Sequence, residues 1–385
     1  MAYFDFNATA PLHPVARETW LKTSADAWQN PGSPYRAGAR AHARLVESRE
    51  CLAGLLDCGP ERIVFTSGAT ESDNTVIASV ASVSGQNDRI AVSPTEHPAV
   101  LEAADRFWGD RVIWLRVDGA GRIDEAHLEE VLVGFRPRLT CIMAANNETG
   151  VVAPVVRLAE LCRRHGSLML CDATQWIGKR PLENLRLPDF LVGGAHKFGG
   201  PKGVGFLRLP KEGQFSSLIR GGRQENGHRA GTENIPSVAA MTAVLSHLKE
   251  EWDCGIPARE ETRRDFESSL KGKVPGVCIV SEDAERLWNT VSVIMPHGEN
   301  TWWARKLDAK DFQVGTGSAC STGEAGPSHV MKAQNIPPDQ ARRMVRLSSG
   351  WSTGPEDWRD LAVLIAELAA EQAAGPVIRI VNSAS

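Results

Sequence analysis

The sequence lacks the features that mark membrane, secreted and nucleic-acid-binding chains. No apolar run approaches the roughly 20 residues that a membrane-spanning helix needs. Residues 1–6 do not combine a basic segment with an apolar one, so we expect no signal peptide. The formal net charge of −4 gives no electrostatic reason to expect nucleic acid or an anionic membrane as a partner. We therefore expect a cytoplasmic protein with no direct contact to nucleic acid or membrane.

The cysteines form neither a disulfide framework nor a pattern typical of structural zinc. The 385-residue chain has eight scattered cysteines and no C-x-x-C pair. Cys162 falls on a predicted helix stripe and Cys171 in a predicted strand, so buried thiols are favoured there and no metal is expected. Cys320 differs, because only alanines are apolar in the glycine- and serine-rich stretch 315–328 around it. That setting favours an exposed, reactive thiol that serves as a nucleophile or carrier.

Strands alternate with helices over about the first 245 residues. A helical i, i+3, i+4, i+7 spacing runs from Val155 to Cys162, and Gly166 suits the end of that helix. Short apolar stretches predict strands at residues 63–66, 89–92, 112–117, 139–144, 168–171, 190–192 and 204–209. Strands separated by helices predict βαβ units and a largely parallel sheet.

The pattern changes after about residue 245, and we interpret residues 250–257 as a boundary. Beyond it, predicted strands at residues 277–280, 290–295 and 344–347 mix with helices in a smaller α+β unit. Pro355 opens a final amphipathic helix whose apolar face we expect in the core. The predicted division is an N-terminal segment at 1–15 that joins the small domain, a large domain at 16–250 and a small C-terminal domain with Cys320 at 251–385.

A lysine on a glycine-rich turn and an acid at a strand end predict a cofactor site. Lys197 follows His196 and is bracketed by glycines, and Asp172 closes an apolar stretch. Pyridoxal 5′-phosphate (PLP) needs an amine for its Schiff base and a carboxylate that keeps the pyridine nitrogen protonated. The alternative for the lysine alone is an ordinary surface position beside a loop.

Three more motifs follow predicted strands. The stretch 67–72 places a glycine turn and hydroxyls at a helix start, which suits either a phosphate or an ordinary N-cap. His97 suits either a stack on a pyridine ring or an exposed loop, and Asn147 suits a contact to the ring hydroxyl. Because ligands of α/β sheets bind at the carboxyl ends of the strands, we expect His97, Asn147, Asp172 and Lys197 to converge on one edge.

Arg346 is a charge between apolar neighbours of a predicted strand. A guanidinium there suits a bidentate grip on a substrate carboxylate, with a structural ion pair as the alternative.

Taken together and in their order along the chain, these motifs resemble those of the cysteine desulfurases. That family belongs to the fold-type-I PLP-dependent superfamily, among the class V aminotransferases. The resemblance covers nearly the whole chain, and the glycine-rich loop at Cys320 is similar to the group I branch, whose extended loop carries sulfur to acceptor proteins. It implies an α/β fold with a large, mostly parallel sheet domain flanked by helices plus a smaller α+β domain. The matching motifs are residues 4–11, 65–72, 96–100, 146–150, 195–197, 317–320 and 345–348.

The resemblance also implies a reaction and roles. The enzyme would convert L-cysteine to L-alanine, with Lys197 as Schiff-base lysine and base at Cα and with Cys320 taking the sulfur as a persulfide for an acceptor protein. His97 would stack on the ring and assist proton transfer. The other implied contacts are Asp172 with the pyridine nitrogen, Gln175 with the ring oxygen, Ala69, Thr70 and His196 with the phosphate, Asn147 and Arg346 with the substrate carboxylate, and Thr232 with the phosphate of the other subunit in a homodimer.

The sequence departs from the family at several positions. Gly194 replaces the serine that is usual three residues before the lysine, which removes one hydroxyl contact to the phosphate. The other departures are Tyr35, Arg223, Asn226 and Trp351. They leave the core chemistry intact and bear on substrate range and on the acceptor.

Several functional alternatives remain open at this point. A selenocysteine lyase or another PLP-dependent C–S lyase is the nearest, followed by a transaminase and by a non-catalytic carrier with the same fold. The acceptor could be an iron–sulfur cluster assembly scaffold, a tRNA thiolation protein, a DNA-modification partner or a biosynthetic enzyme.

Overall fold

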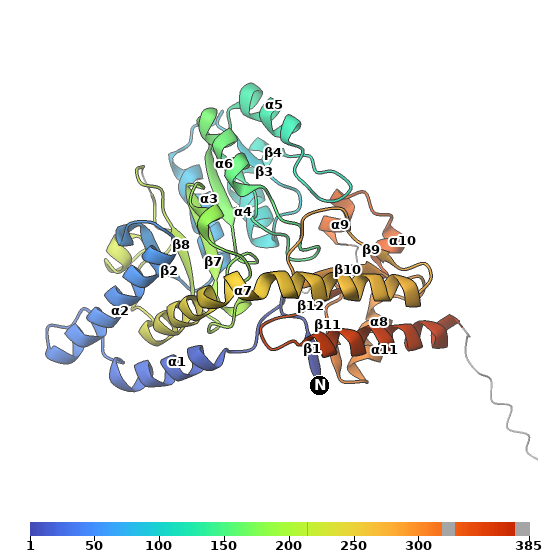
Figure 1. Cartoon of the computed structure of the whole chain (residues 1–385). Coiled ribbons are helices and arrows are strands. Elements are labelled where there is room, and N and C mark those ends of the chain that lie inside the picture. Colours follow the sequence, from blue (N-terminus) through green and yellow to red (C-terminus); the bar gives the residue numbers. More distant parts are fainter. Residues whose placement is uncertain (214, 318–327, 374–385) are drawn as a thin grey trace, which may run out of the picture.

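The structure is a computed structural model that describes residues 1–213, 215–317 and 328–373, with the backbone alone for 251–254. Within these ranges the strands form a seven-stranded sheet, a three-stranded sheet and a two-stranded pair. Figure 1 shows the large sheet among helices in one part of the molecule and the smaller sheets in the other, with helix α7 running from one part to the other.

The large sheet has the strand order β2-β8-β7-β6-β5-β3-β4. Only β8 runs antiparallel to its neighbours, β2 and β7, and all other pairs are parallel. The predicted mostly parallel sheet is therefore confirmed. Its strands are β2 (Ile63–Thr66), β3 (Ile90–Val92), β4 (Val112–Trp114), β5 (Leu139–Cys141), β6 (Leu168–Asp172), β7 (Phe190–Gly194) and β8 (Gly205–Arg208).

Helices cover both faces of this sheet. Leu170 faces a core with α3 and α4, whereas Met169 and Cys171 face a second core with α2, α5, α6 and α7. Successive strand residues point to opposite faces, so a strand buried on both sides is apolar throughout, as the sequence is here. The helices are α2 (Arg36–Leu55), α3 (Ala69–Val83), α4 (Pro98–Trp108), α5 (Glu125–Phe135), α6 (Val155–Arg164) and α7 (Ile235–Lys273).

Two helices add to what the sequence patterns predict. Helix α1 (Pro14–Asp26), which those patterns do not predict, begins after His13, whose ring nitrogen Nδ1 accepts from the Val15 amide as an N-cap. Residues 250–257, interpreted above as a boundary, do not interrupt the helical backbone, since α7 continues through them with Pro257 inside. Helix α7 packs against α1, α2 and α11, and this tertiary packing outweighs the local breaking tendency of proline. The division into domains at residue 250 stays a prediction.

The second part of the molecule includes both distant ends of the described chain. Strand β10 (Thr290–Ile294) pairs antiparallel with β9 (Cys278–Ile279) and β12 (Met344–Ser348), and β1 (Ala2–Phe4) pairs parallel with β11 (Phe312–Val314). Phe4 lies in the same core as residues of α7 and α11. The remaining helices are α8 (Asn300–Asp308), α9 (His329–Ala333), α10 (Pro338–Ala341) and α11 (Pro355–Ala373).

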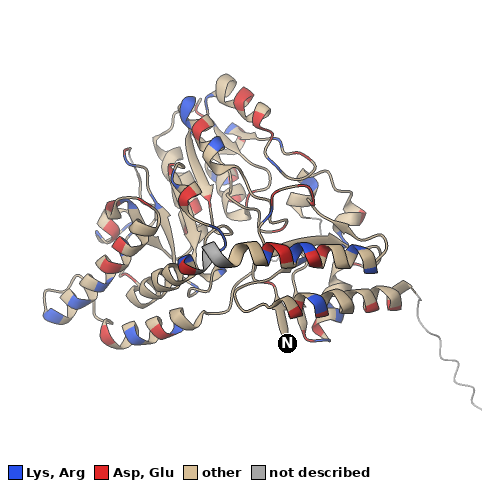
Figure 2. Cartoon of the chain, in the orientation of Figure 1, with Lys and Arg blue, Asp and Glu red and all other residues tan. Residues whose placement is uncertain are grey.

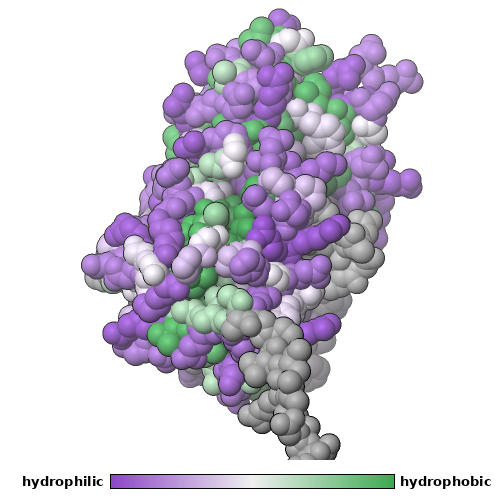
Figure 3. Space-filling model, turned by 90° about the vertical axis from the view of Figure 1, so that its right-hand side faces the viewer, coloured by the Kyte–Doolittle hydropathy of each residue, from purple (hydrophilic) through white to green (hydrophobic). Residues whose placement is uncertain are grey.

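The surface is mixed in charge and mostly hydrophilic. Figure 2 shows basic and acidic residues interspersed on the outer helices. The face in Figure 3 is largely hydrophilic, with apolar residues in small groups. None of the helices in the described ranges is long and apolar enough to cross a bilayer.

The predicted final helix, α11, allows the core that contains Phe4 to be tested. Leu361 of α11 is fully buried at 0% exposure, and Val363 on the same helix is 47% exposed. We expect Leu361→Ala to lower the free energy of unfolding by about 2–5 kcal/mol, because it leaves a cavity. Val363→Ala should change it by less than about 0.5 kcal/mol. Urea denaturation measures both, and equal effects would contradict the assigned core face.

Candidate active site

The predicted site residues gather at one edge of the large sheet because of strand direction. His97, Asn147, Asp172 and Lys197 follow the carboxyl ends of β3, β5, β6 and β7, which run parallel. Strands β2 and β7 are both antiparallel to β8, so β2 ends at this edge too and presents the start of α3. The sheet therefore assembles groups as far apart in sequence as Ala69 and Lys197.

Lys197 closes the short 3₁₀ turn η4 (Ala195–Lys197) directly after β7. Its Nζ donates to the backbone carbonyl oxygens of Asn7, at 2.6 Å, and Ala8, at 2.8 Å. The amine is thus held between the end of β7 and the N-terminal segment, which the sequence analysis did not connect with it.

His97 and Asp172 provide a base and a buried acid. Asp172 is 6% exposed, and its Oδ1 accepts from the Thr174 amide at 2.9 Å. His97 caps α4, and its Nδ1 accepts from the Ala99 amide at 3.1 Å, so the neutral ring carries its proton on Nε2. Burial lowers the pKa of His97 and outweighs the opposing effect of the Asp172 carboxylate. A neutral imidazole suits the predicted stack on a pyridine ring.

The start of α3 suits a phosphate. Its N-cap, Gly68, has a φ of +156° and no side chain to cap the helix, so the first amides there, including those of Ala69 and Thr70, are available to an anion. Nearby, the His196 Nδ1 lies 3.2 Å from the Thr9 Oγ1. Burial, and then the charge of Lys197, lower the pKa of His196 to about 4, so its ring is neutral at pH 7.

Two further observations fit a bound PLP. The Thr174 hydroxyl is buried with no hydrogen-bond partner in the structure. A Cβ placed on Gly194 would lie 3.5 Å from both the Ala69 Cβ and the Thr174 Cγ2. An orphaned hydroxyl beside an uncapped helix start, an amine and a buried carboxylate together match the polar groups of PLP. In the described part of the chain, no three His, Cys, Asp or Glu side chains are grouped to hold a metal.

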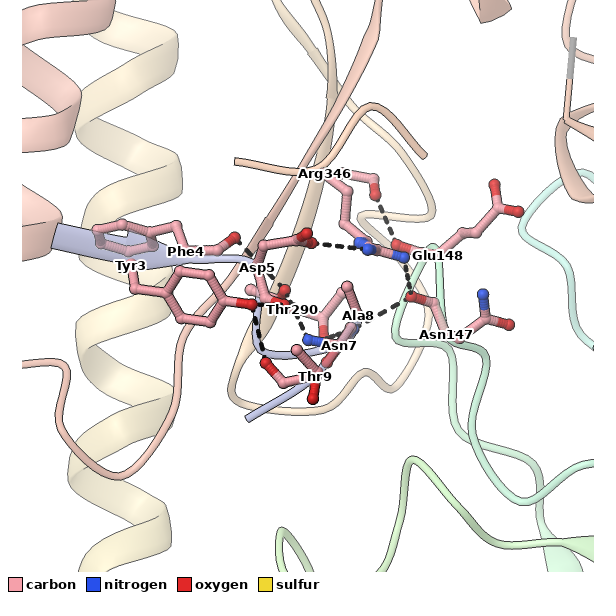
Figure 4. Close-up of polar contacts among 12 residues, drawn as sticks. Tyr3, Phe4, Asp5, Asn7, Ala8, Thr9, Asn147, Glu148, Thr290 and Arg346 are labelled. Carbon is pink, nitrogen blue, oxygen red and sulfur yellow. Dashed lines mark hydrogen bonds and ion pairs between the residues drawn. The ribbon is translucent and has the colours of Figure 1, made fainter. Parts of the chain in front are cut away.

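Arg346, on β12, forms the structural ion pair that was one of its two sequence interpretations, and its contact with a substrate carboxylate stays a prediction. Its Nη2 pairs with the Asp5 Oδ1 at 2.7 Å and its Nη1 donates to the Asn147 carbonyl oxygen at 3.0 Å, as Figure 4 shows. Its Nε is buried with no partner in the structure. An ion pair therefore orients the guanidinium, and its buried Nε is left without an acceptor in the structure. The structure brings Arg346 and Asn147 together as expected and adds Asp5.

Asn7 is the functional residue that sequence reasoning missed. It is 1% exposed, and its Nδ2 donates to the Asn147 carbonyl oxygen at 3.2 Å and to the Thr290 Oγ1 at 2.9 Å (Figure 4). Its own carbonyl oxygen accepts from Lys197 and, at 3.0 Å, from the Nε2 of Gln175. Asn7 lies in a motif that indicated the family, but nothing in the sequence shows these contacts.

The remaining predicted residues are partly described. Thr232 is exposed between η5 (Glu225–Gly227) and α7, and no second chain is present to test its predicted contact. Cys320 lies outside the described residues. Its flanking segments meet at Glu148, whose Oε2 accepts from the Ser328 Oγ at 2.6 Å and would lie 3.7 Å from a Cβ on Gly317. Burial raises the pKa of Glu148.

Comparisons with known proteins identify the family. A family model described as aminotransferase class-V matches residues 2–359. Fold and site thus define a class-V aminotransferase, a class of PLP-dependent enzymes. A cysteine desulfurase of Cereibacter sphaeroides is 38% identical over 94% of both chains, and the IscS cysteine desulfurase of Dictyoglomus turgidum is 34% identical over 92% of this chain and 91% of its own. Within that class, this chain belongs to the cysteine desulfurase family.

Solved structures support the same fold. A NifS-like protein has a TM-score of 0.88 with 30% identity over 96% of this chain and 99% of its own. SspA in complex with cysteine has a TM-score of 0.79 with 27% identity over 90% of this chain and 98% of its own.

Gly194 allows the phosphate site to be tested. The space around it accommodates a Cβ at ordinary contact distances, so Gly194→Ser adds a hydroxyl beside the start of α3 without displacing backbone. A hydrogen bond to a charged group contributes about 1.5 kcal/mol, so we expect the Kd for PLP to fall about tenfold. Titration followed by visible absorbance measures it. Gly194→Ala adds the Cβ without the hydroxyl, and an equal gain there would contradict the assignment.

Proposed function

We propose that this PLP-dependent cysteine desulfurase converts L-cysteine to L-alanine and carries the sulfur as a persulfide on Cys320. The observation that carries the proposal is the position of the Lys197 amine at the sheet edge, in the turn that directly follows β7, the strand next to the one that ends in the buried Asp172. When bound, PLP would supply the electron sink that lets the Cα–H bond of an amino acid break.

The chain's own groups would divide the work as follows. Asp172 would face the pyridine nitrogen and keep it protonated, and the first amides of α3 with His196 would hold the phosphate. The ring of His97, neutral and with its proton on Nε2, would lie against the cofactor. The Lys197 amine would take the Cα proton of the substrate and return a proton later in the cycle. The carbonyl oxygens of Asn7 and Ala8 support this proton transfer, because they orient the free amine of Lys197.

Arg346 and Asn147 would bind the substrate carboxylate. Asp5 holds the guanidinium in a fixed orientation through Nη2, and Nε remains without a protein partner. A substrate carboxylate would supply the acceptor that this buried donor lacks.

Cys320 would take the sulfur as a thiolate, the form in which cysteine is a nucleophile. Its sulfur would attack the substrate sulfur, so that an S–S bond forms while the substrate C–S bond breaks and its electron pair stays with the carbon fragment. A Cβ on Gly317, three residues before Cys320, would lie 3.7 Å from the Oε2 of Glu148, which directly follows Asn147 in the chain. Three extended residues span at most about 11 Å, which supports delivery of the thiol to this site.

The sulfur acceptor and a second subunit are the two partners of the proposed enzyme. We propose that the persulfide passes to an acceptor protein in the cytoplasm, with iron–sulfur cluster assembly as the first pathway to test, and that the enzyme is a homodimer. Exposed apolar side chains near the N-terminal helices support the dimer, among them Leu21 at 55% and Trp28 at 70% exposure. Thr232 would then reach the PLP phosphate of the other subunit.

Cys320→Ser tests the reaction. We expect it to keep the visible absorption of bound PLP and to lose persulfide formation, because serine lacks a transferable sulfur. After incubation with L-cysteine, mass spectrometry of the wild-type peptide should show one added sulfur on Cys320. Sulfide and alanine produced by Cys320→Ser at the wild-type rate would refute the role of the thiol, and comparison with selenocysteine as substrate would identify a lyase.

Thr232→Ala tests the dimer. We expect light scattering to give twice the mass of one chain for both forms, and the variant to bind PLP several-fold more weakly because one hydroxyl donor to the phosphate is lost. Ser237→Ala, at a buried hydroxyl on α7 that is assigned no PLP contact, serves as the control. A monomer that binds PLP as tightly as the dimer would contradict the shared site.

A further inference from the structure

Lys179 is a buried lysine that none of the roles above uses. Its side chain is 5% exposed, and no carboxylate pairs with it in the described part of the chain. Burial, and then the charges of Lys197 and Arg346, hold the pKa of Lys179 well below its ordinary value. A buried amine without a counterion is costly, so its presence calls for an explanation in terms of what it binds.

In the described part of the chain, the Lys179 amine donates hydrogen bonds to Gln175. Its Nζ donates to the Gln175 Oε1 at 2.7 Å and to the Gln175 carbonyl oxygen at 3.0 Å. The backbone of Lys179 is itself held, because the Nε1 of Trp288 donates to its carbonyl oxygen at 2.8 Å. The amine is therefore fixed at the oxygen end of the Gln175 carboxamide.

The other end of that carboxamide points toward the active site. The Gln175 Nε2 donates at 3.0 Å to the Asn7 carbonyl oxygen, which also accepts from Lys197. Rotating the amide by 180° would place its oxygen against this carbonyl and its NH₂ group against the Lys179 amine. Both hydrogen bonds would be lost inside the protein, where unsatisfied polar groups cost most.

We propose that Lys179 is a positioning residue of the cofactor site, which fixes the Gln175 carboxamide so that the second N–H of Nε2 is presented to the ring oxygen of PLP. The inference rests on the proposed contact of Gln175 with that oxygen and deepens it. Lys179 acts through Gln175 alone and touches neither substrate nor cofactor.

Lys179→Met removes the donors and keeps an unbranched apolar side chain of similar length, a replacement that buried sites tolerate. We expect it to shift the visible absorption spectrum of bound PLP and to raise the Kd for PLP about tenfold, as Gln175→Met should. Because both act on one contact, the double variant should be no worse than Gln175→Met alone. Lys211→Met, at an exposed lysine, should leave spectrum and Kd unchanged.

Lys179→Arg keeps N–H donors and should retain most of the wild-type spectrum, which a purely volume-filling role would not require. A wild-type spectrum for Lys179→Met, additive effects in the double variant, or an equal shift for Arg and Met would each overturn the proposal. Thermal melting identifies any variant that does not fold. If Lys179→Met does not fold, the visible spectrum of Lys179→Arg decides for or against the proposal. The spectra need PLP and no cysteine, so a wild-type protein that fails to bind PLP would instead refute the proposed function.

Discussion

The site depends on one shared hydrogen-bond acceptor, the carbonyl oxygen of Asn7. It accepts from Lys197 at 2.6 Å and from Gln175 at 3.0 Å, while the side chain of Asn7 binds Asn147, Thr290 and Asn289. One buried residue thereby connects the sheet edge that holds the cofactor groups to the strands of the second unit. Neighbouring Asp5 extends the same segment to Arg346. The N-terminal segment is thus a structural part of the active site.

Burial is the dominant influence on the basic side chains at this edge. Burial makes the rings of His97 and His196 harder to protonate and does the same to the amine of Lys179. The Arg346 guanidinium and the oriented amides at the start of α3 are therefore the donors that this edge offers to the carboxylate and phosphate of the proposed ligands.

Neighbouring residues of one motif show how far the sequence alone leads. Asn146 and Asn147 look equivalent in sequence, but the Asn146 Oδ1 accepts from the amides of Glu148 and Thr149 and shapes the turn. Of the pair, Asn147 is therefore the one proposed to contact a ligand. The predicted strands were found with ends displaced by up to three residues, because apolar residues such as Ile142 and Ala144 continue past the ladder into turns that are equally buried. Residues 250–257 were interpreted as a boundary, but the backbone of α7 runs through them, because its packing against α1, α2 and α11 outweighs the breaking tendency of Pro257.

The sequence by itself determined the alternation of strands and helices, the acid and the lysine at strand ends, and their common edge, because strand direction in βαβ units follows from local pattern and handedness. Only the tertiary structure decided the contacts of Asn7, Asp5, Glu148 and Lys179. Some of these contacts join residues up to 341 positions apart. In others, the partner of a side chain depends on the rotamer that the surrounding packing allows. No local periodicity encodes such contacts, because the energy that selects them exists only once the two units are packed together.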